Sequence, residues 1–374
     1  NNLSYLTSVS DKEIKTINKK KIITFTTDYS VIKESKFIII CLPTPLKNNS
    51  PDLSYLKKSI IKISKFLKKK QTIILESTSY PGTTSLLAKN LSKRSKLILD
   101  KDFYFGFSPE RENPGGTVKY DKIPKVISST SVKGLKVINE LYTKVFNTVV
   151  ISKSTEEAEA AKLLENCFRS VNIALINELR DLFNKTNLDI WEIIKVAKTK
   201  PFGFMPFYPS VGAGGHCIPI DPVYLSWYAK KNKANTTLLD YSIKFNDSTP
   251  FKVSKKIIKE IKNKKLINKK IIVFGITYKK NVNDIRESAS LKIFKYLLRE
   301  FDNVSYYDEN IKYTKIENKN IYSLTNDKLK ITKDIISIIA VDHRDVNYSQ
   351  ILKKSFLIFD CVNKFKINKK IISI

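Results

Sequence analysis

A glycine-rich loop carries the most reactive side chain that the sequence offers. In the stretch FYPSVGAGGHCIPIDP, three of the four residues before His216 and Cys217 are glycines. Glycines at this density let backbone amides approach a ligand closely, and a thiol placed among them is accessible rather than buried. The loop therefore favours Cys217 as a nucleophile, although a surface loop with an incidental thiol would have the same composition.

A long segment without glycine or proline, residues 154 to 186, supplies two polar candidates. It opens with Ser154 and Glu157 at the spacing of a capping box, so the sequence predicts one long helix. Lys162 and Asn166 are four residues apart and share one face of that helix. A lysine in a lysine-rich protein usually faces solvent, but the alanine and leucine neighbours of this pair make the stretch apolar. The two side chains are therefore candidates for an enclosed site.

Three loops follow the ends of predicted strands: CLPTPL (41–46), ESTSYPGTT (76–84) and FSPERENPGG (107–116). Sheets of the α/β class bind ligands at the carboxyl ends of their strands. Each loop is weak evidence by itself, because Pro, Gly, Ser and Thr are ordinary loop residues. Their common position after strands is what indicates a site.

Short runs of apolar, β-branched residues come before most of these loops and between them, and the strands that such runs predict would hold the loops in position. Such runs are typical of strands buried on both faces, and the Lys-rich amphipathic stretches between them predict helices. The alternation at both ends of the chain predicts parallel α/β sheets. The middle is predicted to be helical, with the long helix, a second helix at 189–199 and a Gly- and Pro-rich loop at 201–222. The predicted strands are residues 21–26, 37–42, 72–77, 148–152, 271–276, 337–341 and 356–360.

Composition argues against several classes of protein. The 374 residues, 42% of them apolar, exceed what one hydrophobic core usually organises, so we expect two or more domains. No run reaches the roughly 18 to 20 apolar residues of a membrane span, and the polar start lacks a signal-peptide pattern, so we expect a cytoplasmic protein with no membrane partner. The cysteines lack paired spacing, so we expect neither a metal site nor a disulfide framework. They are Cys41, Cys167, Cys217 and Cys361.

The net charge of +31 would suit a nucleic-acid-binding protein, because basic surfaces attract phosphate. The excess is nearly all lysine, however, and it is spread along the chain with asparagine and isoleucine. The sequence shows neither an arginine cluster nor a basic stripe interleaved with aromatic residues. A coding bias explains the charge better than a binding face does, so we expect no nucleic-acid partner and keep nucleic-acid binding as an alternative.

Taken in order, the motifs resemble the UDP-glucose/GDP-mannose dehydrogenase family over nearly the whole chain. They are CLPTPL, ESTSYPGTT, FSPERENPGG, EAAKLLENCFRSVNIALINEL, KPFGFMPFYPSVGAGGHCIPIDP and GITYKKNVNDIRES. SPER followed by NPG, together with GGHCIPIDP, is most similar to the UDP-N-acetylglucosamine 6-dehydrogenase branch. The resemblance implies an α/β fold in which two Rossmann-like parallel-sheet domains are joined by a helical central domain. We expect the remainder of an NAD-binding domain at 1–150, a central dimerisation and active-site domain at 151–250, and a UDP-binding domain at 251–374.

The resemblance also implies a reaction. Members of the family oxidise C6 of the sugar twice and pass two hydrides to two NAD molecules. We therefore expect the four-electron oxidation of a UDP-N-acetylhexosamine to its uronic acid, for the synthesis of surface polysaccharide precursors. UDP-N-acetylglucosamine is the favoured sugar, with the galacto and manno epimers behind it. NAD is the expected cofactor, a UDP-sugar the expected substrate, and a homodimer through the central helix the expected assembly.

The catalytic roles of the family match particular positions of this sequence. Cys217 would attack the C6 aldehyde to form a thiohemiacetal, whose oxidation leaves a thioester for water to open. Lys162 and Asn166 match the pair that stabilises the oxyanion and holds a water. Asp221 matches the carboxylate that orients this water. The remaining matches around the water and C6 are Thr78 and Glu110.

Two further groups of positions match the binding residues of the family. The residues expected to contact the sugar or UDP are Glu110, Arg111, Lys162, Asn166, Tyr208, Gly212, Tyr278 and Lys279. The residues expected to line NAD are Cys41, Pro43, Thr44, Pro45, Ser77, Thr78 and Arg286.

Two departures from the family pattern bear on activity. Asp360 is followed by Cys361, where the family usually has a stretch with an arginine that meets the substrate. The family also opens with a strand, a GxGxxG turn and a second strand that ends in an acidic residue, whereas the opening of this sequence resembles the segment after them. We therefore expect the first domain to be N-terminally truncated, and weigh the alternative of an inactive remnant that binds UDP-sugars or dimerises. We expect residues 1–374 alone to bind UDP-sugar but NAD only weakly, and therefore not to run the reaction.

Overall fold

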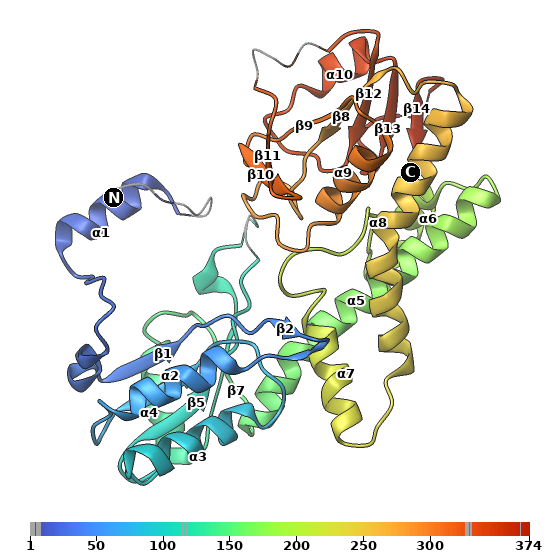
Figure 1. Ribbon diagram of the computed structural model, residues 1–374. Coiled ribbons are helices and arrows are strands. Elements are labelled where there is room, and N and C mark those ends of the chain that lie inside the picture. Colours follow the sequence, from blue (N-terminus) through green and yellow to red (C-terminus); the bar gives the residue numbers. More distant parts are fainter. Residues whose placement is uncertain are drawn as a thin grey trace. The chain divides into compact units, whose positions relative to one another are not determined.

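The computed structural model describes residues 4, 9–113, 116, 118–325, 329, 331–366 and 368–374. The chain forms two compact units (Figure 1). Unit 1 comprises the residues up to Cys167 together with Ile220–Thr236, and unit 2 comprises Phe168–Pro219 and Thr237–Ile374. Each unit is built on its own five-stranded sheet.

The sheet of unit 1 has the order β1-β4-β5-β6-β7. The pairs β1–β4, β4–β5 and β6–β7 are parallel, but β5 and β6 are antiparallel, which departs from the predicted all-parallel arrangement. The strands are β1 (Phe37–Ile40), β4 (Thr72–Leu75), β5 (Tyr104–Phe107), β6 (Lys125–Ser129) and β7 (Val149–Ile151).

Helices cover both faces of this sheet, as side-chain alternation along β4 shows. Ile73 and Leu75 pack with residues of α2 and α3 in one apolar cluster. Ile74, between them, packs with Ile138 and Tyr142 of α4 in another cluster. Successive strand residues point to opposite faces, so an unbroken apolar run is what a two-sided sheet requires. The helices are α2 (Ser54–Ser64), α3 (Thr83–Ser95) and α4 (Val132–Tyr142).

Smaller elements complete unit 1, and one predicted strand is wrong. Residues 22–26 form no strand, and Phe25 is 83% exposed. The apolar, β-branched residues there have strand propensity, but no described strand supplies the hydrogen-bonding partner that a strand needs. The smaller elements are α1 (Asp11–Lys20), η1 (Tyr29–Glu34), β2 (Leu46–Lys47), β3 (Ser50–Pro51), η2 (Tyr120–Lys122) and α7 (Asp221–Lys231).

The sheet of unit 2 is wholly parallel and has the order β14-β13-β12-β8-β9. After β8 the chain passes through α9 to β9 on one side, and then returns to β12 on the other side of β8. The strand order therefore reverses between β8 and β12, and open α/β sheets bind ligands at such a switch point. The strands are β8 (Lys270–Phe274), β9 (Val304–Tyr307), β12 (Ile335–Ile339), β13 (Leu357–Asp360) and β14 (Ile371–Ser373). The other elements are α9 (Ala289–Glu300), α10 (Tyr348–Lys354) and the hairpin β10 (Tyr313–Ile316) and β11 (Lys319–Tyr322).

Long helices occupy the middle of the sequence. The predicted long helix is confirmed as α5 (Thr155–Lys185), and the Ser154 Oγ accepts the Glu157 backbone N–H at 3.1 Å, as the capping spacing predicts. The second predicted helix is α6 (Ile190–Ala197). A further helix, α8 (Thr237–Asn263), contains Pro250, so the boundary expected at residue 250 falls inside it. The three-part division of the chain stays a prediction.

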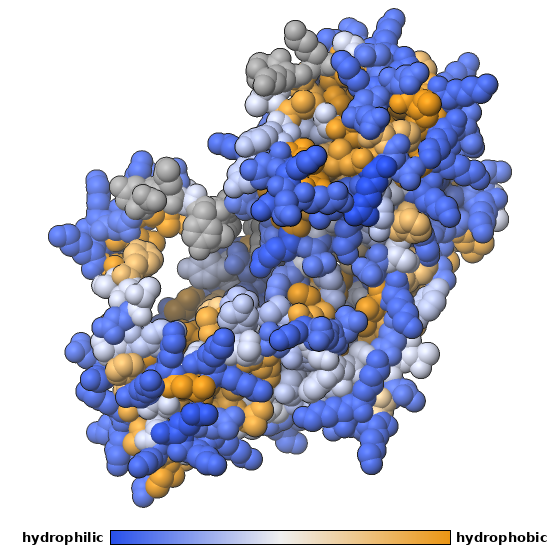
Figure 2. All heavy atoms as spheres, viewed as in Figure 1, coloured by the Kyte–Doolittle hydropathy of each residue, from blue (hydrophilic) through white to orange (hydrophobic). Residues whose placement is uncertain are grey.

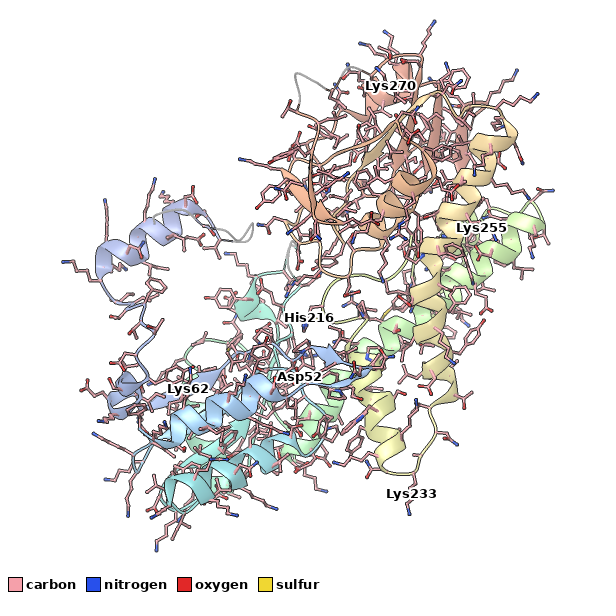
Figure 3. All side chains as sticks on the ribbon, in the orientation of Figure 1. Asp52, Lys62, His216, Lys233, Lys255 and Lys270 are labelled. Carbon is pink, nitrogen blue, oxygen red and sulfur yellow. The ribbon has the colours of Figure 1, made fainter. Side chains whose placement is uncertain are left out.

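Polar side chains dominate the visible face of the molecule (Figure 2). Apolar side chains on this face lie in separate patches. The labelled lysines Lys62, Lys233, Lys255 and Lys270 come from four different parts of the sequence (Figure 3). Within the described residues, no helix is long and apolar enough to cross a membrane.

Candidate active site

The loops after β1 and β4 lie side by side in unit 1, because these neighbouring parallel strands end at the same edge of the sheet. The Leu42 backbone N–H donates to the Ser77 Oγ at 2.8 Å. The Thr44 carbonyl accepts the Tyr224 hydroxyl of α7 at 2.9 Å. Thr44 is buried, whereas Cys41 is exposed. Residues 41–45 and 77–78, predicted to line NAD, are thus brought together by hydrogen bonds.

Asn166 and Asp221 form the most enclosed polar pair of the predicted site. The Asn166 Nδ2 donates to the Asp221 Oδ2 at 2.6 Å, and both residues are buried. Burial raises the pKa of Asp221 to about 7, against the opposing effects of the Lys162 charge and the Asn166 hydrogen bond. A carboxyl group with this pKa can take up or release a proton near neutral pH, which is what a general acid or base requires.

Lys162 links this pair to the loop after β5. Its Nζ donates to the backbone carbonyl of Glu110, and its charge lowers the pKa of Asp221. The Glu110 side chain in turn accepts the backbone N–H groups of Arg111 and Glu112, at 2.7 and 2.5 Å. Three residues from distant parts of the sequence therefore converge here, and Lys162 is not simply a solvent-facing lysine.

Arg111 is fixed by contacts within unit 1. Its guanidinium lies 2.7 Å from a Glu165 carboxylate oxygen and donates to the Pro124 carbonyl at 2.8 Å. Together with Glu110 and Lys125 it lines a small pocket. Thr78, the other polar residue predicted near C6, is partly buried directly after Ser77.

The cysteine loop lies in unit 2, where it packs against the loop that follows β8. Gly215 has φ +83°, and a Cβ there would lie 2.8 Å from the Tyr278 ring. The Gly215 backbone N–H donates to the Arg286 carbonyl at 3.1 Å. Cys217 is exposed, and Tyr278 and Arg286 are close enough to interact with it electrostatically. The glycine is thus needed for close approach, and it places the thiol beside residues that the sequence predicts to bind substrate and cofactor.

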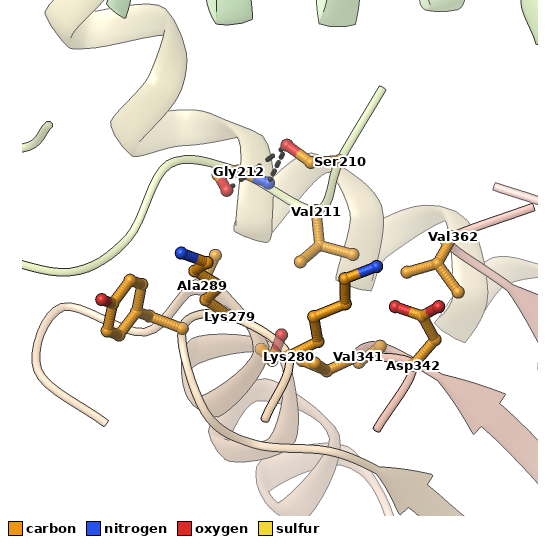
Figure 4. A pocket seen from close by; sticks show the side chains of 12 residues that line it. Ser210, Val211, Gly212, Lys279, Lys280, Ala289, Val341, Asp342 and Val362 are labelled. Atoms are coloured by element: carbon orange, nitrogen blue, oxygen red, sulfur yellow. Dashed lines mark hydrogen bonds between the residues drawn. The ribbon is translucent and has the colours of Figure 1, made fainter. Parts of the chain in front are cut away.

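A pocket lies at the switch point between β8 and β12 (Figure 4). The empty space within it, including space open to solvent, is about 500 Å³. The Lys279 and Lys280 side chains both extend from the loop after β8 into it. Burial, Arg169 and Lys280 lower the pKa of Lys279. The lining residues are Ser210, Val211, Gly212, Tyr278, Lys279, Lys280, Ala289, Ser290, Ala340, Val341, Asp342 and Val362.

Tyr208 and Arg286, predicted to contact the substrate and NAD, are not among the residues that line this pocket. Tyr208 stacks on Trp191, with ring centroids 5.8 Å apart. Arg286 pairs with Asp284 through two guanidinium nitrogens, at 2.7 to 3.1 Å. Their predicted contacts with substrate and cofactor remain predictions.

Models of one protein family match three successive parts of the chain. The NAD binding domain of the UDP-glucose/GDP-mannose dehydrogenase family matches residues 6–146, its central domain residues 156–248, and its UDP binding domain residues 272–367. The UDP-N-acetyl-D-glucosamine 6-dehydrogenase of Salmonella typhi is 33% identical over 299 residues, which cover 78% of this chain and 70% of that protein. The UDP-N-acetyl-D-mannosamine dehydrogenase of Methanocaldococcus jannaschii is 35% identical over 327 residues, 85% of this chain and 71% of that protein.

The chain belongs to the UDP-glucose/GDP-mannose dehydrogenase family. A solved structure, the UDP-D-ManNAc dehydrogenase of Pyrococcus horikoshii, has a TM-score of 0.84 at 28% identity, covering 96% of this chain and 84% of that one. The chain is therefore a nucleotide-sugar dehydrogenase with NAD as cofactor and a UDP-binding domain. This confirms the resemblance and the α/β fold class, whereas the N-terminal truncation stays a prediction.

The loops of unit 1 fit NAD in this dehydrogenase. They lie at the carboxyl edge of parallel strands, where dinucleotides bind, and the Leu42–Ser77 hydrogen bond fixes their spacing. Residues 41–45 and 77–78 would hold the cofactor. The bound NAD supplies the acceptor for hydride, and the protein supplies position and electrostatics.

Unit 1 also contains an ionic cluster around the buried Lys125 that the sequence did not reveal. The Lys125 Nζ lies 3.1 Å from a Glu76 oxygen and 3.9 Å from a Glu110 oxygen. The Tyr142 hydroxyl donates to Glu76. Lys125 therefore connects the loop after β4 with the loop after β5. Glu76 stands in the ESTSYPGTT motif, but nothing distinguishes Lys125 from the other lysines before its burial is known.

Glu159 is a second residue that sequence analysis missed. It is fully buried on α5 and accepts the backbone N–H groups of Gly82 and Thr84 at 2.6 and 2.7 Å. The hydroxyls of Ser79 and Thr84 also donate to it. Burial raises the pKa of Glu159 to about 7, and the hydrogen bonds oppose this shift. Its carboxylate caps the first turn of α3.

Proposed function

We propose that the chain oxidises C6 of a UDP-N-acetylhexosamine to the uronic acid, with UDP-N-acetylglucosamine as the favoured sugar. Two relatives, named for UDP-N-acetyl-D-glucosamine and UDP-N-acetyl-D-mannosamine, support the acetamido-sugar class. The product would serve as a precursor of surface polysaccharide. The observation that carries the proposal is the buried Asn166–Asp221 pair beside Lys162, because it provides both a cation and a carboxyl group with a pKa near 7.

In the proposed reaction, the first oxidation converts the C6 alcohol to the aldehyde with loss of one hydride and one proton. The Cys217 sulfur then bonds to C6, and the aldehyde oxygen takes up a proton to complete the thiohemiacetal. Loss of a second hydride and a proton leaves a thioester. Water adds to C6, and cleavage of the C–S bond releases the acid and restores the thiol.

Lys162, Asn166 and Asp221 have separate roles in this proposal. The Lys162 ammonium stabilises negative charge on the C6 oxygen, since a fixed cation in a dry site favours an oxyanion. Asn166 holds Asp221, and ionised Asp221 takes a proton from the water that opens the thioester. Thr78 and Glu110 complete the polar surroundings of C6.

We also propose that Gly212, Tyr278 and Lys279 hold the UDP part in the pocket of unit 2. The switch-point position and the Lys279 ammonium support this assignment, because a diphosphate needs a cation at close range. Arg111 and Tyr208 are proposed contacts of the sugar or UDP. Arg286 is a proposed contact of NAD.

The proposed assembly is a homodimer through α5. Four apolar side chains recur along this helix at spacings of four, seven and seven residues, and between 46% and 64% of each is exposed. An apolar stripe of this period is typical of a helix that packs against another helix. Leu175→Glu should shift the sedimentation of a dimer to that of a monomer, whereas Lys185→Glu should not. The stripe residues are Leu164, Phe168, Leu175 and Leu182.

A substrate panel tests the proposed reaction. The assay, like the other activity measurements, uses the chain preceded by the GxGxxG segment that the family pattern leads us to expect. This protein is incubated with NAD and, separately, UDP-N-acetylglucosamine, its galacto and manno epimers, or UDP-glucose. We expect two NADH for each uronate formed, and the highest kcat/KM with UDP-N-acetylglucosamine. Activity with UDP-glucose alone, or one NADH for each aldehyde released, would contradict the proposal. UDP-sugar binding without NAD reduction would favour the non-catalytic alternative.

A further inference from the structure

Buried His343 joins the two loops that form the switch-point pocket of unit 2. Its Nδ1 accepts the backbone N–H of Asn281 at 3.0 Å. The next residue, Arg344, donates its own backbone N–H to the Asn281 Oδ1, also at 3.0 Å. Asn281 has φ +58°, a conformation that asparagine tolerates better than most residues. The loop after β8 is thus fastened at Asn281 to the loop after β12.

These hydrogen bonds determine which imidazole nitrogen carries the proton. A backbone N–H can only donate, so the Nδ1 facing Asn281 must be the unprotonated acceptor. The proton of the neutral ring is then on Nε2, which lies 3.2 Å from both the Asp308 Oδ2 and the Thr277 Oγ1. The Asn310 Nδ2, at 3.2 Å from Nδ1, fits the same assignment.

Asp308 holds the other side of the ring in place. Its Oδ2 accepts the Ile276 backbone N–H at 2.8 Å, and its Oδ1 accepts that of Asn310 at 2.9 Å. Asp308 and His343 are each 2% exposed, and Thr277 is fully buried. The orientation of the imidazole is therefore fixed by buried partners on both nitrogens.

The fastened segment carries residues that line the pocket. Thr277 donates its hydroxyl to the Lys279 carbonyl at 2.9 Å, so the segment is held at Thr277 and again at Asn281. Between these two points stand Tyr278, Lys279 and Lys280. We propose that His343 is a positioning residue for UDP binding: by accepting the Asn281 N–H, it holds Tyr278 and Lys279 in place without touching the ligand itself. The inference rests on the proposed binding of UDP by these two residues.

Three substitutions separate the two nitrogens. His343→Asn places an amide oxygen near the position of Nδ1, so it keeps an acceptor for the Asn281 N–H. His343→Gln places an amide nitrogen near the position of Nε2, so it keeps the donor to Asp308 and loses the acceptor. His343→Ala loses both. Ser337→Ala is the matched control, because it removes a buried Ser337–Ser355 hydrogen bond in the same sheet without touching the loop.

Calorimetric titration with UDP, together with melting temperature, is the measurement. Loss of one buried hydrogen bond should weaken UDP binding by about tenfold in His343→Gln and His343→Ala. His343→Asn should stay within about threefold of the unsubstituted protein, and Ser337→Ala should bind UDP normally despite a lower melting temperature. Equal affinities in the three His343 variants, or affinities that follow the melting temperatures alone, would overturn the proposal.

A second variant tests the fastening of the loop at Asn281 through its other hydrogen bond, the one from Arg344. Asn281→Gly keeps the backbone N–H and readily adopts positive φ, but it removes the bond from Arg344. We expect the Kd for UDP to rise about threefold, and an unchanged Kd contradicts the inference even where the His343 variants do not fold. If the unsubstituted protein fails to bind UDP, the proposed function of the pocket fails instead.

Discussion

Asp221 and Glu159 are both buried carboxyl groups of unit 1, and burial raises the pKa of each to about 7. Their surroundings differ. Glu159 accepts four hydrogen bonds from the first turn of α3 and the residues before it. Asp221 accepts one described side-chain hydrogen bond, from Asn166, and lies within the influence of the Lys162 charge. A raised pKa therefore does not by itself identify a catalytic group; the number of donors already bound to the carboxylate separates a helix cap from a site.

Among the residues of this comparison, the largest expected effect is that of Asp221→Asn on turnover. The amide cannot take a proton from water, so we expect uronate formation to fall about ten-thousandfold, the upper end of typical general-base effects. Thioester hydrolysis, followed in single-turnover experiments, should be the slowed step. Thioester hydrolysis at the normal rate in this variant would contradict a general-base role for Asp221. Asp221 would then be a structural carboxyl group, as Glu159 is.

The same substitution should stabilise the fold at alkaline pH. The pKa of Asp221 is 3.8 ordinarily and about 7 when folded, so the folded state holds this proton more tightly between these values. The free energy of unfolding then falls as pH rises from about 4 to 7. Above pH 7 the Asp221 carboxylate is charged in the folded state, and the whole of this stabilisation is lost. Asp221→Asn, which can still accept from Asn166, should melt higher than the unsubstituted protein at pH 8, and this advantage should shrink towards pH 4.

A smaller loss of turnover is expected from Lys162→Met. Removal of one oxyanion-stabilising donor typically costs about a hundredfold to a thousandfold in kcat, with little effect on UDP-sugar binding. Because the Lys162 charge lowers the pKa of Asp221, its loss should also move the acidic limb of the kcat profile to higher pH. Lys185→Met, at the exposed end of the same helix, is the control. Unchanged turnover and an unchanged pH profile would contradict a catalytic role for Lys162 and leave it as an ordinary solvent-facing lysine.

The smallest effect on turnover is expected from Glu159→Gln. One side-chain oxygen of Glu159 serves three donors, and the other accepts the Gly82 N–H. The amide of glutamine has an NH₂ group where the carboxylate has its second oxygen. At least one of these donors therefore loses its acceptor, and we expect a loss of about 1 to 3 kcal/mol in the free energy of unfolding. Denaturant unfolding at pH 8 should thus show opposite signs for Glu159→Gln and Asp221→Asn. A stabilised Glu159→Gln would remove the distinction between the two carboxyls.

Sequence patterns predicted elements whose burial is continuous. β4 and β12 are mostly apolar and are buried along their whole length, and α5 has a capping signal and no glycine or proline. β5, with Gly106 inside it, and β6, which mixes lysine and serine with apolar residues, have weak patterns, so neither is among the predicted strands, although the loop at 107–116 was expected at a strand end. α8 was missed because it contains Pro250 among polar residues, and packing against α9 stabilises it nonetheless.

The candidate site was predictable where local spacing sets it, and not where tertiary burial does. Helical periodicity placed Lys162 and Asn166 on one face, but the identity of Asp221 as the partner came from the family resemblance. Lys125 is one of 67 lysines and arginines, and its ion pairs depend on residues far away in sequence. His343 likewise acquires its partners only when β8, β9 and β12 are assembled in one sheet.

The central claim is that Cys217 forms the covalent link to C6. The direct measurement is mass-spectrometric detection of UDP-uronate after incubation of the Cys217→Ala protein with NAD and UDP-N-acetylglucosamine, beside the unsubstituted protein and a Cys361→Ala control at a buried cysteine. The account predicts no uronate from Cys217→Ala, and uronate from both of the other proteins. Uronate formation at the normal rate by Cys217→Ala would contradict it.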